Sequence, residues 1–260
     1  MIPRLFVAEH LQKGARFQAD ERAAHYLMNV LRRGSDDPVL LFNGRDGEYR
    51  GRIAEAQKRR LVLEALEQTR AQEPEPDLWL CFAPLKKDAV DFLVEKGTEL
   101  GVARFQPVLT AHTASNRINQ SRLTTVATEA AEQSERLTVP EVLEPISLES
   151  LRTGWTKDRH LLICAEAGAA VPIGQALTGL TSDVSSPHKF AVLIGPEGGF
   201  QDDELDRLKK LPFVTAVGLG PRILRAETAA LAALSAFQAI LGDGAKRPPR
   251  STGGPSGAPA

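Results

Sequence analysis

Two glycine-rich segments hold the residue types best suited to binding a ligand. The first, Val192–Leu205, runs from an apolar stretch into a turn with Gly195, Gly198 and Gly199, and then into an acidic helix start. Glycines let a backbone approach a ligand closely, and the free N–H groups at a helix start are hydrogen-bond donors. A plain strand-to-helix turn needs one or two glycines, so this spacing favours a binding loop.

The second segment, Val217–Ala230, repeats the order of strand, glycine loop and helix. Gly218 and Gly220 begin like a dinucleotide-binding fingerprint, but Ile223 occupies the place of the third glycine. No lysine follows either loop at the position that binds phosphates in P-loop proteins. The sequence therefore predicts neither a Rossmann site nor nucleotide triphosphate hydrolysis.

Charged residues stand beside both loops. Glu197 lies within the first loop, and Arg222 and Arg225 lie at the exit of the second. Ligands of open α/β sheets bind outside the carboxyl ends of the strands, so we expect the two loops to emerge there side by side and enclose one small, flat ligand. The charged side chains could act in catalysis or hold the loops together, and the spacing fits both.

The segments that position these loops alternate between strands and helices. Apolar runs predict strands at residues 78–82, 105–109, 161–165 and 190–194. Helical spacing predicts helices at residues 88–100, 121–137 and 226–241, and a further helix that starts at Asp202. Gly101 fits the position just past a helix end. The alternation predicts an α/β fold with a mostly parallel sheet flanked by helices.

The first part of the chain is expected to be mostly β. Strands are predicted at residues 38–42, 48–56 and 60–66, with turns at Asn43-Gly44 and Asp46-Gly47 and one helix from an Asp20 cap to Leu31. A small barrel or a curled sheet is the natural packing for such strands. Residues 71–77 contain two prolines and have the composition of a linker.

These features divide the chain into a β domain over residues 1–70, the linker over 71–77 and the α/β domain over 78–243. Residues 244–260 hold four glycines and four prolines and are predicted to be a disordered tail. The β domain carries 13 Lys and Arg against 10 Asp and Glu, while the whole chain has a net charge of −1. This balance excludes a bulk polycation but not a local basic face that binds nucleic acid.

The composition also limits the compartment and the metal chemistry. Cys81 and Cys164 lie in apolar runs, which indicates buried thiols rather than a disulfide framework or a cysteine-bound zinc. The five histidines lack the spacing of metal ligands, so no metal is predicted. The N-terminus has no signal-peptide core, and no apolar run approaches the ~20 residues of a membrane span. We expect a cytoplasmic protein that does not enter a membrane.

The motifs resemble a known family. Ile194–Phe200 and Leu219–Ala229 look like the paired signature of the bacterial 16S ribosomal RNA (uracil-N3)-methyltransferases of the SPOUT class. The resemblance extends to Phe92–Val102, to Glu129–Pro140 and, near the N-terminus, to Pro3-Arg4-Leu5-Phe6 and to the pair His25 and Val30-Leu31-Arg32, and so covers about residues 2–242. Cys164-Ala165-Glu166 matches a third ligand loop less sharply.

The resemblance implies a PUA-like RNA-binding domain with a β-barrel, followed by a trefoil-knotted methyltransferase domain. It implies a homodimer that uses S-adenosylmethionine to methylate N3 of a uridine in 16S ribosomal RNA of the small ribosomal subunit. The loops identified above would grip the cofactor through Glu166, Leu193, Ile194, Gly195, Pro196, Gly198, Gly199, Leu219, Gly220, Ile223, Leu224 and Thr228. RNA is expected to contact dispersed basic residues, namely Arg4, Arg32, Arg33, Lys86, Lys87, Arg117, Arg122 and Arg136.

The chemistry of the implied reaction assigns roles to two charged residues. N3 of a neutral uridine carries a proton, so methyl transfer needs that proton removed and the resulting negative charge supported. We expect Arg225 to stabilise charge on the uracil oxygens, and Glu197 is the first choice for the base, although it could instead pair with an arginine or position the cofactor.

Two other functions fit the same residues. One is an RNA methyltransferase that acts on a ribose 2′-hydroxyl or on another base, since glycine loops serve any such activity. The other is a non-catalytic ribosome-assembly factor that binds RNA but no cofactor. The intact glycines and Arg225 argue against the second, because a pocket without a ligand has no need of them.

Overall fold

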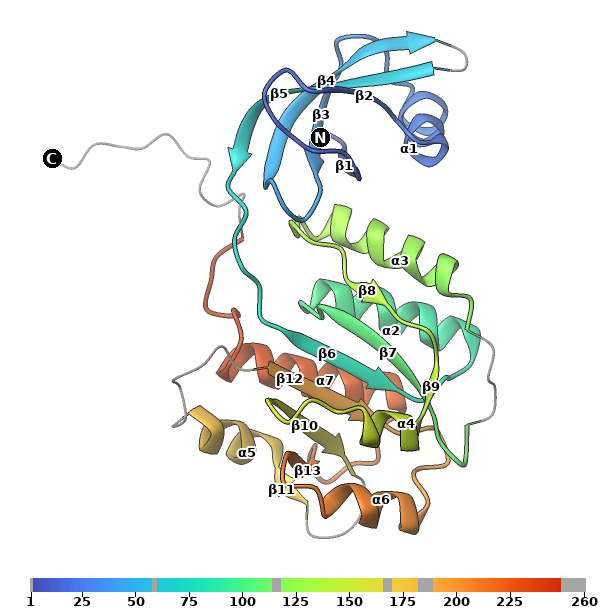
Figure 1. The fold of residues 1–260 in the computed structure, drawn as a ribbon, viewed down its shortest axis with the longest axis vertical. Helices are drawn as coiled ribbons and strands as arrows, with labels where there is room; N and C mark the ends of the chain where they lie inside the picture. Colours follow the sequence, from blue (N-terminus) through green and yellow to red (C-terminus); the bar gives the residue numbers. More distant parts are fainter. Residues whose placement is uncertain (1, 58–59, 114–117, 166–169, 182–188, 249–260) are drawn as a thin grey trace, which may run out of the picture. The chain divides into compact units, whose positions relative to one another are not determined.

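The computed structural model describes residues 2–57, 60–113, 118–165, 170–181 and 189–248 (Figure 1). The chain forms two compact units: unit 1 joins Met1–Pro74 with Ala127–Val139, and unit 2 joins Glu75–Val126 with Pro140–Ala260. The sequence suggests two consecutive domains, whereas unit 1 takes a second segment from the middle of the chain. Most of the predicted tail, residues 249–260, lies outside the described residues.

Unit 1 is built on a five-stranded sheet with the order β1-β3-β4-β5-β2. Strands β1 and β3 are parallel, and the other neighbours are antiparallel. Alternate residues such as Leu41, Ile53 and Leu63 are fully buried against Leu27 of the helical segment. The strands are β1 (Arg4–Phe6), β2 (Arg16–Gln18), β3 (Pro38–Phe42), β4 (Glu48–Gln57) and β5 (Arg60–Arg70), and the helical segment is α1 (Glu21–His25) with a π-helical turn (Tyr26–Val30).

A buried arginine explains why unit 1 includes residues 127–139. The Arg4 guanidinium donates to Glu48 Oε2 at 2.6 Å, to the carbonyl oxygen of Ala131 at 2.8 Å and to the carbonyl oxygen of Arg136. It also lies 3.8 Å from the ring centroid of Phe42. Arg4 is only 7% exposed, and these three hydrogen-bond partners all belong to unit 1. The buried guanidinium therefore attaches residues 127–139 to the β sheet.

A second arginine forms a parallel connection. Arg22 donates to both carboxylate oxygens of Glu132, at 2.7 and 3.2 Å, and the backbone N–H of Phe6 donates to Glu132 Oε1 at 3.0 Å. The bond to Glu132 raises the pKa of Arg22. A bidentate arginine–carboxylate pair fixes both position and orientation, which adds to the attachment of this segment to the β sheet.

Unit 2 is built on a parallel sheet with the order β11-β13-β10-β12-β6-β7-β8, to which β9 adds beside β7. Each strand pairing in it is parallel. The strands are β6 (Leu78–Phe82), β7 (Arg104–Leu109), β8 (Glu141–Val142), β9 (Ile146–Ser147), β10 (Arg159–Cys164), β11 (Val171–Pro172), β12 (Lys189–Ile194) and β13 (Val214–Gly218). The helices are α2 (Lys87–Glu99), α4 (Leu148–Thr153), α5 (Ile173–Leu180), α6 (Asp202–Lys209) and α7 (Ala226–Ile240). Helix α3 (Gln120–Gln133) begins in unit 2, and its residues from Ala127 on belong to unit 1.

Helices cover both faces of this sheet, as Figure 1 shows. On one face, Leu151 of α4 and Leu208 of α6 pack in one cluster with Cys81, Ile163 and Leu193 of the central strands. On the other, the ring of Phe237 in α7 lies 5.2 Å from that of Phe190 in β12. The predicted mostly parallel, helix-flanked sheet is therefore confirmed. The sequence could indicate it because strands buried on both faces need apolar side chains in continuous runs.

The buried Arg4–Glu48 pair gives a test of unit 1. We expect Arg4→Met to destabilise unit 1 by about 3–5 kcal/mol, because buried Glu48 would lose its ion-pair partner at 2.6 Å and keep only the more distant Arg70, at 3.8 Å. Hydrogen–deuterium exchange of β3, β4 and residues 127–139 should rise together. Arg16→Met is the matched control, since the Arg16 side chain is 53% exposed and its ion pair with Glu64 should contribute little. Unchanged exchange in Arg4→Met would contradict the role of this pair.

Candidate active site

The two glycine loops leave the carboxyl edge of the unit 2 sheet on either side of β10. Register pairs Cys164, the last residue of β10, with Ile194 of β12 and with Val217 of β13. Both loops therefore start from the carboxyl edge of the sheet, and β10 lies between β12 and β13, the strands that carry them. The segment that follows β10 emerges between the loops, but its predicted ligand residue Glu166 lies outside the described residues.

The first loop is shaped by its glycines. Leu193 and Ile194 are buried in β12, and a Cβ on Gly195 would come within 2.9 Å of the Phe200 ring. The chain then turns at Glu197 and Gly198, and Gly199 N donates to Pro196 O at 2.9 Å. Gly199 has a φ of +71°, a conformation that residues with a Cβ rarely adopt. The result is an exposed turn at the end of a buried strand.

The segment after β7 holds this loop in place. Glu204 Oε2 accepts from Gln201 N at 3.0 Å at the start of α6, and Glu204 Oε1 accepts from Ala111 N at 2.9 Å. The ring nitrogen Nδ1 of His112 lies 3.2 Å from Gly198 O and 3.1 Å from Gly199 O. Sequence reasoning did not identify His112 as a site residue, since these contacts join positions 86 and 87 residues apart.

The second loop leaves β13 and leads into α7. Gly220 has a φ of +106°, and Arg225 precedes α7 with an extended backbone. Leu219 and Leu224 are half-buried, while Arg222, Arg225 and Thr228 are exposed and Ile223 is 87% exposed. Ile223 therefore presents an apolar side chain at the surface of this loop.

The charged residues beside the loops are not bound to each other. Within the described part of the chain, the side chains of Glu197, Arg222 and Arg225 make no hydrogen bond or ion pair. The alternative in which they merely hold the loops together therefore has no support among these residues. Their charges are available to a ligand.

The loops have the features that a flat adenosine-containing cofactor requires. A Cβ built on Gly199 or Gly220 would meet nothing within 4 Å, so space lies over both backbones. Exposed Ile223 adds an apolar surface, and the turn adds polar backbone groups, as small-molecule sites need. S-adenosylmethionine, which has both apolar and polar parts, fits this combination of open space, apolar surface and polar backbone groups.

Two other kinds of chemistry find no support in the described residues. Burial raises the pKa of both Cys81 and Cys164 to about 12, so neither thiol forms a nucleophilic thiolate near neutral pH. Among the described residues, no three His, Cys, Asp or Glu side chains are grouped as metal ligands.

No described helix is long and apolar enough to cross a membrane.

The expected RNA-binding residues have different surroundings. Arg4 and Arg136 are buried in unit 1, which does not support their expected contact with RNA. Arg32 is exposed, with an unusual φ of +53°, and Arg33 is half-buried with Asp37 at 3.8 Å. Lys86 and Lys87 are exposed where β6 leads into α2, Arg122 pairs with Asp91, and Arg117 lies outside the described residues.

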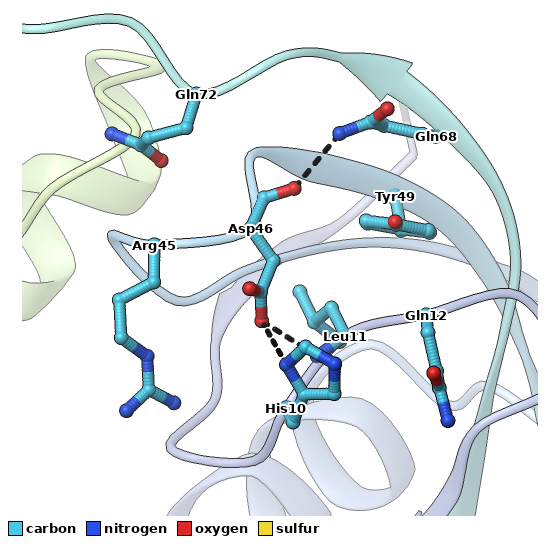
Figure 2. A pocket seen from close by; sticks show the side chains of 8 residues that line it. All are labelled: His10, Leu11, Gln12, Arg45, Asp46, Tyr49, Gln68 and Gln72. Atoms are coloured by element: carbon cyan, nitrogen blue, oxygen red, sulfur yellow. Dashed lines mark hydrogen bonds and ion pairs between the residues drawn. The ribbon is translucent and has the colours of Figure 1, made fainter.

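Unit 1 also has an open polar pocket, organised by Asp46 (Figure 2). Asp46 Oδ2 accepts from Asn43 Nδ2 at 2.6 Å, from Leu11 N at 2.8 Å and from His10 Nδ1 at 2.9 Å. These bonds, that from Asn43 most, lower the pKa of the Asp46 carboxyl. Gln68 Nε2 donates to the backbone oxygen of Asp46 at 2.9 Å. Asp46 therefore connects its own turn to residues 10–11 and to β5 in the wall of the pocket.

Known families match both parts of the chain. A family model described as an RNA methyltransferase domain matches residues 71–238. A second, described as an RNA methyltransferase PUA domain, matches residues 19–66. A ribosomal RNA small subunit methyltransferase E from Rickettsia conorii is 32% identical over 238 residues, which cover 89% of this chain and 93% of that protein.

Solved structures resemble the fold over nearly the whole chain. A ribosomal RNA small subunit methyltransferase E from Neisseria gonorrhoeae, bound to S-adenosyl methionine, matches with a TM-score of 0.81 and 28% identity over 94% of this chain and 99% of that chain. A methyltransferase from Legionella pneumophila, in complex with the same cofactor, matches with a TM-score of 0.79 and 26% identity over 92% of this chain and 98% of that chain.

The Asp46 network predicts a dependence of stability on pH. A depressed pKa in the folded protein means that this carboxylate stabilises unit 1 above its unfolded pKa, about 3.9, and that the contribution disappears as pH falls through the folded value. We expect Asp46→Asn to lower the thermal midpoint at pH 7 and to approach the wild type in acid below about pH 4. Thermal unfolding across pH measures this, and a gap that stays constant into acid would contradict it.

Proposed function

Because the chain belongs to the RNA methyltransferase family, with its methyltransferase domain at residues 71–238 and its PUA domain at residues 19–66, we propose that it methylates N3 of a uridine in 16S ribosomal RNA with S-adenosylmethionine. The relative from Rickettsia conorii is named for action on small-subunit ribosomal RNA, and the structure from Neisseria gonorrhoeae holds S-adenosyl methionine. The observation that carries the proposal is the pair of open glycine loops that flank β10, with Arg225 beside them.

The residues of the two loops would hold the cofactor. The backbone of Gly195, Gly198 and Gly199 would face it from one side, and that of Gly220 with the side chains of Ile223 and Leu224 from the other. Leu193, Ile194, Pro196, Leu219 and Thr228 complete the proposed set, and Glu166 belongs to it by family resemblance. When bound, S-adenosylmethionine supplies an electrophilic methyl carbon.

Arg225 would support the charge that develops on the substrate. Loss of the N3 proton spreads negative charge onto the two uracil oxygens, and a guanidinium donates hydrogen bonds in a fixed fork. Arg225 is exposed and has no side-chain partner among the described residues, so it can turn toward a bound base. Glu197, equally exposed at the tip of the first loop, is a candidate for the proton acceptor.

RNA would be held by basic residues at the surface of each unit. Lys86 and Lys87 follow β6, and Ala83 N donates to Ile194 O at 3.0 Å, so these lysines start from the same sheet edge as the first glycine loop. In unit 1, exposed Arg32 is the stronger candidate and Arg33 the weaker, because Asp37 already neutralises part of its charge. Arg117 remains a candidate by sequence alone.

Further parts of the proposal concern assembly and location. We propose that the enzyme is a homodimer with a trefoil-knotted catalytic domain, as in the resembling family. The substrate, the small ribosomal subunit, implies the cytoplasm.

Substrate mapping tests the proposed function. Mass spectrometry of ribosomal RNA after incubation with the protein and cofactor should find N3-methyluridine. A methylated ribose or a different base would instead support another RNA methyltransferase activity. Absence of cofactor binding in calorimetry would support the non-catalytic assembly factor.

Arg225 gives a residue-level test. We expect Arg225→Ala to lower the rate of methyl transfer by about 10²–10³-fold, the effect of removing a donor from developing negative charge. Cofactor affinity should not change, because the Arg225 side chain is not among the groups proposed to hold the cofactor. Arg207→Ala is the matched control, since Arg207 is an exposed arginine of α6 paired with Asp203. Turnover equal to the wild type in Arg225→Ala would remove Arg225 from the mechanism.

A further inference from the structure

His112 is an exposed histidine whose ring has a defined orientation and tautomer. Its Nδ1 lies 3.2 Å from Gly198 O and 3.1 Å from Gly199 O. Carbonyl oxygens only accept hydrogen bonds, so Nδ1 must carry the hydrogen in this arrangement. In the neutral ring, Nε2 then holds a free lone pair and can accept a proton.

The backbone around His112 keeps this ring at the tip of the first glycine loop. Thr113 N donates to Thr110 O at 3.1 Å, and Thr110 N donates to Thr113 Oγ1 at 2.8 Å, which closes a tight turn. Ala111 N donates to Glu204 Oε1 at 2.9 Å, so the turn is attached to the start of α6. A base oriented by a third group is the arrangement that general-base catalysis uses.

We propose that His112 is the general base that removes the N3 proton of the uridine, an inference that rests on the proposed function. His112 Nε2 takes the proton, and the N3 electron pair forms the bond to the methyl carbon. The electron pair of the broken carbon–sulfur bond stays on the sulfur. The imidazolium then loses its proton to water, so one proton is released for each methyl group transferred.

His112 suits this role better than Glu197. Glu197 is part of the turn that the His112 ring contacts. Within the described residues, the Glu197 carboxylate has no partner that orients it, whereas the His112 ring is held by two carbonyl oxygens. The titratable groups on the facing segments are Glu197 in the loop and Asp202, Asp203 and Glu204 at the start of α6.

Asparagine at this position separates the base from the hydrogen-bond donor. In His112→Asn, the amide nitrogen is attached to the same carbon position as Nδ1 and can donate to Gly198 O and Gly199 O, but no basic nitrogen is left. In His112→Ala, both properties are lost. Glu197→Gln tests the competing base in the same assays.

The proposal predicts different results for these variants in single-turnover methylation and in calorimetry with S-adenosylmethionine. His112→Asn should bind the cofactor like the wild type and transfer the methyl group about 10²–10⁴-fold more slowly, the usual effect of losing a general base. His112→Ala should show the same loss of rate and also weaker binding, by about three- to tenfold for the lost hydrogen bond. Glu197→Gln should retain much more activity than His112→Asn.

Two further readouts do not depend on the size of the rate loss. The wild-type rate should level off as pH rises, while the His112→Asn rate should keep rising with hydroxide concentration. Nitrogen-15 NMR of the protein without cofactor should show a protonated Nδ1 and an unprotonated Nε2 in the neutral ring of His112. The NMR measurement needs no variant and no turnover.

Three results would overturn the proposal. They are wild-type turnover in His112→Asn, a greater loss in Glu197→Gln than in His112→Asn, and an NMR spectrum in which Nε2 carries the hydrogen. Failure of the proposed function looks different, because the wild type itself would then produce no N3-methyluridine. His112→Asn turnover at the wild-type level, with N3-methyluridine formed, would reject the base and leave the proposed function standing.

Discussion

The parallel register of the unit 2 sheet is the constraint on which the candidate site depends. Because β6, β12, β10 and β13 run in one direction, their carboxyl ends meet at one edge, and every loop that leaves them starts from there. Continuous apolar runs bury most of β6, β10 and β12, and β13 is partly buried. The two glycine loops can be open and exposed because the strands that support them are not.

Sequence reasoning could predict the elements that repeat a simple physical pattern. Apolar strands such as β3 and β6 match their predicted residues. Asp20 caps the start of α1 with its side chain, and Gly101 follows the end of α2, where a residue without a side chain is favoured. The short strands β2 and β11 have no such pattern. Their extended form comes from pairing with β5 and β13, so only the tertiary structure reveals them.

Contacts between distant positions account for the remaining differences. Nothing in the sequence order indicates that residues 127–139 join unit 1, since Arg4 and Arg22 reach them over more than 100 positions. Arg4 shows the same limit of sequence analysis. Its place in a family motif predicted an RNA contact, but its guanidinium is buried and donates to backbone carbonyl oxygens. The strand order, with β10 between β12 and β13, also follows from the fold and not from the order of the glycine motifs along the chain.

The position of β10 between the two loops has a consequence for the stability of unit 2. A ligand that contacts both loops joins chain segments near residues 194 and 220 across a strand to which neither is covalently adjacent. Such a ligand acts as a non-covalent cross-link in the folded state alone. Its stabilising effect therefore grows with the logarithm of ligand concentration, so unit 2 should resist unfolding and proteolysis to a degree set by the local supply of cofactor.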